Sequence, residues 1–456
     1  MLENLTLPAF TDLVDAQLFV SLHVLVIVVH VVLISVAYLV MAERKISAYI
    51  QDRIGPNRTG FDFGLPWLAF LKGFLGLGQP LADGIKFLVK EDYTPLNVDK
   101  ALFTLGPVLI IIPALIGFAV IPWGGVWVTP EIPIPFLGTL ESQEVVVAGA
   151  NVDVGLIYLL AVASLGVYGV TIGGWASNNK YSFLGGLRAT AQMISYEIPL
   201  GLSILAVLLI VGSLLPVKII DWQADNGWML FAQPIAGVLF FLAILAEANR
   251  APFDNAEAEQ ELVGGYHTEY SSMRFALYFL AEYAHLVTST AFFVLLFLGG
   301  WQLLPGFDPL PETAEGWAGL LVVMAKFGIF FGKVLLIACF TMVIRWSLPR
   351  MRYDQVMQMA WQGVIPLSLS VVVMTSVWVF MGWTNLPALL LGNVVVFAIA
   401  LAVQPFLPKY SAIHRLPLYG SRFNPISPAD VNTAPTNPLA LEDRPVQGTA
   451  SYSTGV

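Results

Sequence analysis

The feature that most constrains this chain is a series of nine apolar runs. A helix needs about 20 residues to cross the hydrocarbon of a bilayer. Runs of that order lie at 17–41, 101–123, 154–174, 189–214, 229–247, 274–300, 318–344, 363–382 and 386–406. Only 12% of the 456 residues are charged, against about 25% in a soluble domain. The sequence therefore predicts an all-α polytopic membrane protein with about nine transmembrane helices.

Lysine and arginine predict the orientation of these helices, because the cytoplasmic connections of membrane proteins are enriched in them. Of the 22 Lys and Arg residues, only Lys218, Lys326 and Lys333 lie away from one set of connections and the C-terminal tail. That set consists of the loops 43–100, 175–188, 248–273 and 345–362, with the residues directly beside them. We therefore expect these loops to be cytoplasmic in a protein of the bacterial inner (plasma) membrane.

The same orientation divides the chain into three parts. We expect an N-terminal extracytoplasmic segment over 1–16, a transmembrane domain over 17–406 and a cytoplasmic tail over 407–456. The tail is rich in proline and serine without periodicity, which predicts an extended segment. In the loop 43–100, Leu81, Ile85 and Leu88 share one helical face, which predicts an amphipathic helix lying flat on the membrane.

Charge and cysteine content exclude several functions. The net charge of −9 argues against a nucleic-acid binder, which needs a basic face. The single cysteine, Cys339, cannot by itself hold an iron–sulfur cluster or a structural zinc ion. The five histidines lack the HExxH spacing of metal ligands. We expect no metal and no covalently held redox centre on this chain.

Ionisable residues inside the apolar runs are candidates for function. Each costs about 2.5–3.5 kcal/mol at mid-bilayer. Glu197 lies in the fourth run, and Glu282 lies in the sixth with His285 three residues later on the same helical face. Lys326 and Lys333, seven residues apart, share a face of the seventh run. Such groups form either ion pairs that lock the bundle or a path for protons.

The densest anionic stretch of the chain, AEANRAPFDNAEAEQELVGGYHTEY at 246–270, lies between two apolar runs. It holds six carboxylates and one cation, Arg250. A solvated linker would explain the charges, but not the apolar residues and glycines interleaved with them. Irregular backbone at membrane depth occurs only where protein buries it or where it lines a cavity. We therefore predict a packed re-entrant segment.

Five motifs in collinear order carry a resemblance to a known family. They are MAERKISAYIQDRIGPNRTG at 41–60, LADGIKFLVKED at 81–92, SYEIPLG at 195–201, AEANRAPFDNAEAEQELVGGYHTEYSSMRFALYFLAEYA at 246–284 and IRWSLPRMRYDQVM at 344–357. Together they resemble the family of membrane-arm subunits that adjoin the quinone site in respiratory complex I, the proton-translocating NADH–quinone oxidoreductase. The resemblance covers roughly 17–382 and leaves the ninth run and the tail outside it.

The resemblance implies one subunit of an enzyme, with no complete active site on this chain. Such a subunit forms much of the chamber that the quinone enters, anchors the peripheral arm, and begins an acidic path that links quinone reduction to proton pumping. FMN and iron–sulfur clusters belong to partner subunits. The implied partners are the quinone-site subunits of the peripheral arm, small neighbouring membrane subunits and lipid.

The resemblance also assigns roles to individual residues. The proton-path residues are Glu43, Glu197, Glu247, Glu282 and Lys333, together with the acidic-loop residues Asp254, Glu257, Glu259, Glu261 and Glu269. Residues matching the quinone entrance are Arg44, Arg53, Asp83, Arg250 and Arg345. Residues matching the peripheral-arm anchor are Arg350, Arg352 and Asp354. His285 departs from the family, where asparagine is frequent, and the resemblance assigns no role to Lys326.

Three other interpretations compete with this one. A subunit of a membrane-bound hydrogenase would share the fold but use no quinone. A stand-alone transporter predicts inverted repeats, yet the acidic stretch and RIGPNR have no second copy in the sequence. A scaffold that only binds the peripheral arm would not need buried acidic residues, whose burial costs free energy. The forms RIGPNR and RAPFD favour the complex I subunit.

Overall fold

The computed structural model describes residues 15–61, 72–73, 75–134, 138–256, 258–305, 309–311 and 313–403. For residues 132–134, 138–140 and 259 it describes the backbone alone. Residues 1–14 of the expected N-terminal segment, Glu257 and the expected tail 407–456 therefore lie outside the described part.

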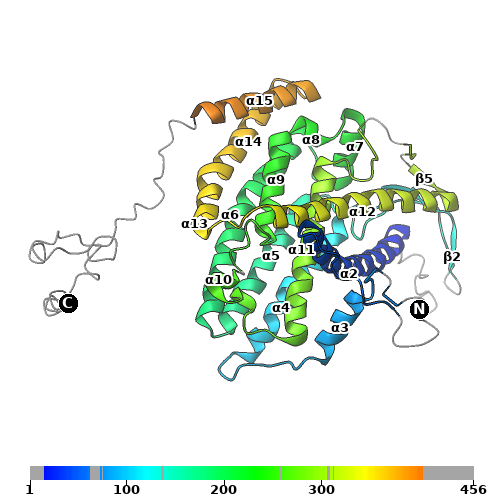
Figure 1. Ribbon diagram of the computed structural model, residues 1–456. Helices are drawn as coiled ribbons and strands as arrows, with labels where there is room; N and C mark the ends of the chain where they lie inside the picture. The colour runs from blue at the N-terminus through cyan, green and yellow to red at the C-terminus, as the bar shows by residue number, and fades with distance from the viewer. Residues whose placement is uncertain are drawn as a thin grey trace, which may run out of the picture. The chain divides into compact units, whose positions relative to one another are not determined.

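Each of the nine apolar runs is mainly helical where the structure describes it (Figure 1). Eight helical stretches are long and apolar enough to cross a membrane. They are α2 (Ala16–Ile50), α4 (Lys100–Ile116) with the 3-10 turn η2 (Gly117–Val120), α5 (Gly155–Ala176), α6 (Lys180–Val211), α11 (Ser272–Phe297), α12 (Gly316–Ser347), α13 (Tyr353–Met359) continued by the π turn η4 (Ala360–Val364) and α14 (Ile365–Phe380), and α15 (Leu386–Val403). The prediction of an all-helical integral membrane protein is confirmed.

The fifth apolar run differs from the expectation. It consists of α8 (Met229–Ala232) and the 14-residue helix α9 (Pro234–Glu247). At 1.5 Å per residue α9 is about 21 Å long, short of the bilayer core of about 30 Å. Its last residues, Ala243 to Glu247, are buried, and the chain continues into the packed segment that follows. Hydropathy counts apolar residues and does not locate the point where such a helix ends.

Several helices extend beyond their apolar runs. α2 continues to Ile50, α6 begins at Lys180 and α12 ends at Ser347. The side chain of Asn179 accepts a hydrogen bond from the Tyr181 amide and so caps α6 at a polar position. The connection between α5 and α6 is therefore only 177–179, because backbone hydrogen bonding continues where apolarity stops.

Shorter elements occupy the connections. They are α3 (Gln79–Val89), α7 (Pro216–Asn226), α10 (Glu259–Leu262) and the 3-10 turn η3 (Gly265–His267). In α3, Leu81, Ile85 and Leu88 are exposed, as expected for an amphipathic helix with an apolar face turned away from this chain.

Two small sheets lie in the connections between helices. In the first, β1 (Val126–Val128) pairs antiparallel with β4 (Glu144–Val146) and parallel with β5 (Thr313–Glu315), with Trp127 opposite Val145 and Ala314. In the second, β2 (Ile132–Ile134) pairs antiparallel with β3 (Gly138–Leu140). The β1–β5 pairing ties the chain before α5 to the chain before α12.

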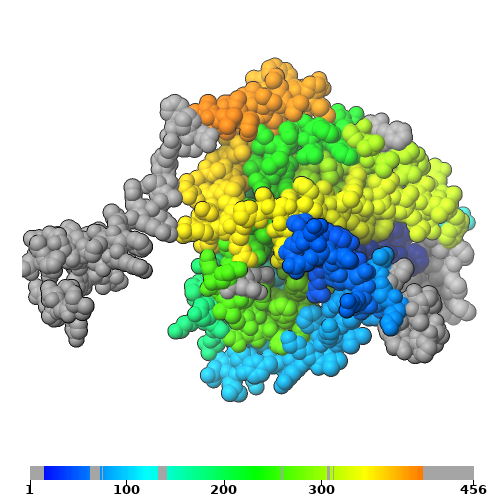
Figure 2. Space-filling model, viewed as in Figure 1, coloured from blue at the N-terminus to red at the C-terminus, as the bar shows by residue number. Residues whose placement is uncertain are grey.

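The helix α11 lies at the centre of the bundle. In the most apolar 18-residue stretch of α11, 72% of the residues are buried. This is the largest such share among the eight span-length stretches of the described chain. It packs against α2, α4, α9 and α12. Figure 2 shows α2, in blue, between α12 and α3 on one face of the molecule, in agreement with their contacts. Side chains of α11 therefore meet side chains from several other helices.

Small residues allow α4, α5 and α11 to approach closely. The Tyr278 hydroxyl of α11 donates a hydrogen bond to the Gly169 carbonyl at 3.2 Å. A Cβ atom on Gly173 would lie 1.9 Å from the Tyr278 Oη atom, and one on Gly106 would lie 3.0 Å from the Gly173 Cα atom. Glycine at such contacts lets backbones of membrane helices pack directly.

We predict that Gly173→Ala destabilises the chain, because the added methyl group must displace the Tyr278 ring. Overpacking of this kind costs about 1–3 kcal/mol. Thermal unfolding of the detergent-purified protein would show a lowered midpoint. Gly166→Ala on the same helix is the control, because nothing lies within 4 Å of its added Cβ atom. An unchanged midpoint for Gly173→Ala would contradict the close packing.

Candidate functional site

A buried arginine joins two carboxylates from different helices. Arg250 follows α9, and its Nη1 atom lies 3.0 Å from Oε2 of Glu43 on α2. Its Nε atom lies 2.9 Å from Oε1 of Glu282 on α11. The side chains of Arg250, Glu43 and Glu282 are 4%, 7% and 10% exposed, so these charges meet inside the protein. We call this group, with Tyr283 and Arg345, the Arg250 cluster.

Two further side chains complete the Arg250 cluster. Arg345, near the end of α12, places Nη1 2.5 Å from the second oxygen of Glu43. The Tyr283 hydroxyl donates to Glu43 Oε2, and the Tyr283 ring lies 4.1 Å from the Arg250 guanidinium carbon. Glu43 therefore forms ion pairs with two arginines and accepts a hydrogen bond from one hydroxyl group. Because α2, α11, α12 and the segment after α9 all contribute, the bundle itself holds the cluster together.

The charges within the Arg250 cluster balance. Two guanidinium groups face two carboxylates, which lowers the cost of burying each ion. Burial opposes the charge of Arg250, but Glu282 and Glu43 outweigh it and raise the pKa of the guanidinium. Arg250 therefore stays protonated. Any change in protonation beside it must take place on its carboxylate partners.

The segment after α9 is packed against the bundle, as the sequence predicts. Residues 248–256 are all buried. The Gln192 amide on α6 donates to the carbonyls of Ala246 and Phe253, both at 2.8 Å, and to Asn249 Oδ1 at 3.2 Å. The Met351 amide donates to the Pro252 carbonyl at 3.0 Å. These bonds satisfy buried polar groups at the end of α9 and in the irregular segment that follows it.

Most described acids of this segment have cationic or amide partners. Asp254 Oδ2 lies 2.7 Å from Nη2 of Arg350. Burial raises the pKa of Asp254, although Arg350 and Arg345 act to lower it. Glu261 Oε2 lies 2.5 Å from Arg188, and Glu269 Oε1 accepts from the Asn179 amide at 2.6 Å. The carboxylates thus tie the segment to the start of α6 and to the chain after α12.

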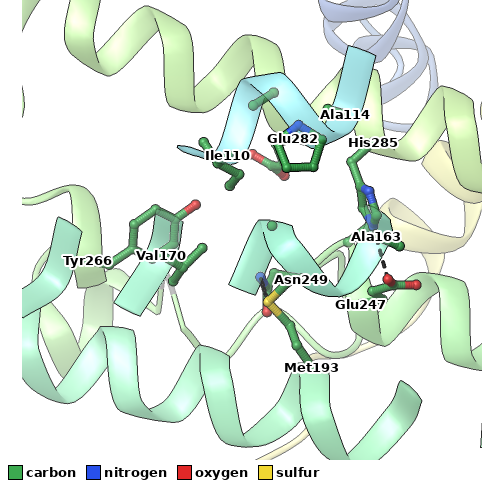
Figure 3. Close-up of a pocket in the computed structure, with 14 residues that line it drawn as sticks. Ile110, Ala114, Ala163, Val170, Met193, Glu247, Asn249, Tyr266, Glu282 and His285 are labelled. Atoms are coloured by element: carbon green, nitrogen blue, oxygen red, sulfur yellow. Dashed lines mark hydrogen bonds and ion pairs between the residues drawn. The ribbon is translucent and has the colours of Figure 1, made fainter. Parts of the chain in front are cut away.

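Glu247 and His285 form a second buried pair beside the Arg250 cluster. The Nε2 atom of His285 lies 3.5 Å from Oε1 of Glu247, and the two side chains are 17% and 8% exposed. Both line a small cavity of about 30 Å³ that Glu282, Asn249 and Tyr266 also line (Figure 3). Figure 3 shows Tyr266 on the opposite side of this cavity from His285. Glu282 and His285 therefore do share a face, as their spacing predicts.

Other predicted site residues lie apart from this cavity. Glu197 on α6 is half-buried and accepts a hydrogen bond from Ser164 of α5. Lys333 donates to the carbonyls of Leu298 and Gln302, beyond the end of α11. Leu298 is sixteen residues after Glu282, or about 24 Å along a helix. Lys326, also on α12, is buried with its ammonium 5.8 Å from the Trp301 ring.

The residues predicted for the quinone entrance fall into two groups. Arg250 and Arg345 belong to the buried Arg250 cluster. Arg44 and Asp83 instead form a more exposed pair at 2.8 Å, which joins α2 to α3. Arg53 is exposed.

Of the residues predicted for the peripheral-arm anchor, Arg350 pairs with Asp254, while Arg352 and Asp354 form an exposed pair at 3.1 Å. The Glu257 side chain and the Glu259 side chain lie outside the described part of the structure.

Three residues that organise the site were not predicted from the sequence: Tyr283, Gln192 and Asn249. Tyr283 follows Glu282 directly in the chain, yet a helix turns neighbouring side chains about 100° apart, so adjacency does not predict a shared partner. Gln192 and Asn249 are uncharged, so a search for intramembrane charges passes over them. Their polar side chains in or beside apolar runs were the available signal.

The fold and the enclosed charges define a polytopic integral membrane protein with paired ionisable groups inside its helical bundle. A sequence model described as NADH dehydrogenase matches residues 23–376, which is most of the chain. The chain belongs to the NADH dehydrogenase family.

Named relatives agree with this assignment, and all three are H subunits of NADH-quinone oxidoreductase. The relative from Geobacter sulfurreducens, the first of two in that organism, is 44% identical over 364 residues, which cover 79% of this chain and 95% of the relative. The relative from Leptospira biflexa is 44% identical over 363 residues, covering 78% and 94%. The relative from Flavobacterium psychrophilum is 39% identical over 365 residues, covering 80% and 98%.

We predict that Arg250→Ala strongly destabilises the chain, because it leaves Glu43 and Glu282 buried with less compensating charge. Breaking a buried ion pair by removing one partner costs about 3–5 kcal/mol. The measurement is the unfolding midpoint in detergent, together with the amount of folded chain in the membrane.

Arg352→Ala is the matched control for this prediction. Its pair with Asp354 is exposed, and exposed pairs contribute no more than about 1 kcal/mol. Equal stability of the Arg250 and Arg352 variants would show that the Arg250 cluster does not hold the bundle together.

Proposed function

We propose that the chain is the subunit of NADH–quinone oxidoreductase that lines the quinone path and couples quinone reduction to proton translocation. Its relatives carry the name of one subunit of that enzyme complex. The chain is accordingly one subunit of an enzyme and not a complete enzyme. In this proposal FMN and iron–sulfur clusters belong to partner subunits, and the single cysteine of this chain cannot by itself ligate a cluster.

The observation that carries the proposal is a series of buried charged residues. It leads from the acidic segment after α9, residues 248–261, into the helical bundle. Asp254 pairs with Arg350, Arg250 pairs with Glu43 and Glu282, and Glu282 lines the same cavity as Glu247. Charges interact more strongly in a protein interior than in water. A change of charge beside the segment 248–261 would therefore alter the proton affinity of carboxylates deeper in the bundle.

The proposed quinone path runs beside α2 and α3. The Arg44–Asp83 pair joins these helices, and Gln79 also donates to Asp83 at 2.8 Å. The exposed apolar face of α3 suits an isoprenoid tail, while the charged pair beside it suits a polar head group. In this proposal the loops that bear these residues face the cytoplasm, where the peripheral arm docks on the exposed Arg352 and Asp354.

The proposal is tested by affinity purification of the chain in mild detergent, followed by mass spectrometry and an NADH–quinone assay. We expect flavin and iron–sulfur subunits in the eluate, with inhibitor-sensitive quinone reduction. A nickel–iron hydrogenase subunit without quinone activity would instead place the chain in a hydrogenase complex. A chain that elutes alone would favour a stand-alone transporter.

We further predict that the acidic segment responds to quinone reduction. Simultaneous Glu→Gln changes at 257, 259 and 261 would lower the number of protons moved per NADH oxidised, because the segment could no longer bind protons at these positions. The measurement is acidification of proteoliposomes that contain the purified complex. Glu131, Glu141 and Glu144, exposed acids in the connection before α5, provide a matched triple control. Unchanged pumping in the first triple variant would refute the responsive segment.

A further inference from the structure

Glu247 differs from the other buried carboxylates in its partner. Glu43 and Glu282 are matched by the guanidinium groups of Arg250 and Arg345. The basic group beside Glu247 is the imidazole of His285. An arginine stays protonated in a protein, whereas an imidazole gains and loses a proton near neutral pH. The Glu247–His285 pair can therefore exchange a proton in a way that the Arg250 cluster cannot.

The pair also lies where two cavities meet. Glu247 and His285 line the cavity shared with Glu282, and they line a second small cavity of about 30 Å³. The second cavity also has Thr288 and Ser289 in its wall. Glu282, His285 and Ser289 follow one another at spacings of three and four residues, so they form a polar stripe on one face of α11. Both cavities thus reach the same two titratable side chains.

Few other ionisable groups face His285. In the described lining of the first cavity they are Glu247 from α9, Glu282 from α11 and Tyr266 from η3. In the second cavity Glu247 alone joins His285 among the described lining residues. The residues that α4, α5 and α6 contribute to these walls are uncharged. Arg250 contacts one of these ionisable residues, Glu282.

We propose that His285 is a proton-transfer residue that passes protons between these two cavities through Glu247. This inference rests on the proposed function and names a residue that the family resemblance does not assign. A proton from water in the first cavity binds the neutral imidazole and forms an imidazolium ion. The imidazolium then gives the proton at Nε2 to Oε1 of the Glu247 carboxylate. The resulting carboxylic acid releases the proton to water in the second cavity, and every step runs equally in reverse.

The geometry suits such a step. Transfer from imidazolium to carboxylate leaves a neutral acid and a neutral imidazole, so the net charge of the buried pair does not change. The separation of 3.5 Å exceeds an ordinary hydrogen bond by a few tenths of an ångström. Groups that transfer protons are often at such distances before they act.

The test uses the whole complex in proteoliposomes, with NADH oxidation and proton uptake measured together. His285→Gln keeps an amide that reaches Glu247 but cannot carry a proton, and we expect at least a tenfold loss of proton translocation. His285→Ala opens space beside both cavities. We expect added imidazole to restore part of its translocation, with a pH profile that moves when methylimidazoles of other pKa replace imidazole.

Variants of Glu247, Glu282 and His285 separate the inference from the proposed function. Glu247→Gln should abolish translocation with or without imidazole. If Glu247→Gln uncouples the complex but His285→Gln pumps as the wild type does, the inference about His285 fails and the proposed function stands. If Glu247→Gln and Glu282→Gln both leave pumping intact, the proposed function itself fails. An Ala variant that assembles but does not respond to imidazole also overturns the role of His285.

Discussion

The structure depends on how a buried guanidinium is compensated. Arg250 lies almost fully inside a bundle whose other contacts are mostly apolar, and an isolated charge in such surroundings is very costly. Glu43 and Glu282 supply the compensating charge from two helices, and Arg345 balances the second charge of the pair. The positions of α2, α11, α12 and the segment after α9 are therefore linked through one electrostatic cluster.

This linkage explains why α9 is short. A helix of full span would carry residues 248–256 past the bundle, away from Glu43 and Glu282. Instead α9 ends at Glu247, and the chain folds back against α6, where Gln192 satisfies three of its acceptors. Non-helical backbone is tolerated there because the protein buries it and supplies its hydrogen bonds. The same turn places Glu247 beside His285.

The sequence predicted the helices well and their ends less well. Long apolar runs predicted all nine helical regions because lipid demands internally satisfied backbone hydrogen bonds. The apolar residues and glycines within the acidic stretch predicted its packing. The stretch 180–188 is helical although it is not apolar, because Asn179 caps a helix that hydropathy cannot detect. Sequence spacing predicted that Glu282 and His285 share a face, since both lie on one helix.

No pattern in the sequence predicts which residues of different helices contact one another. Glu43 and Arg345 are 302 positions apart, and Glu43 and Arg250 are 207 apart. By itself the sequence determined a helical membrane protein, its family and the identity of its intramembrane charges, because composition and local periodicity record the solvent and the helix. Only the tertiary structure decided that Arg250 joins Glu43 to Glu282 while Glu247 faces His285. Partner choice depends on how separate helices pack, and local periodicity does not record that packing.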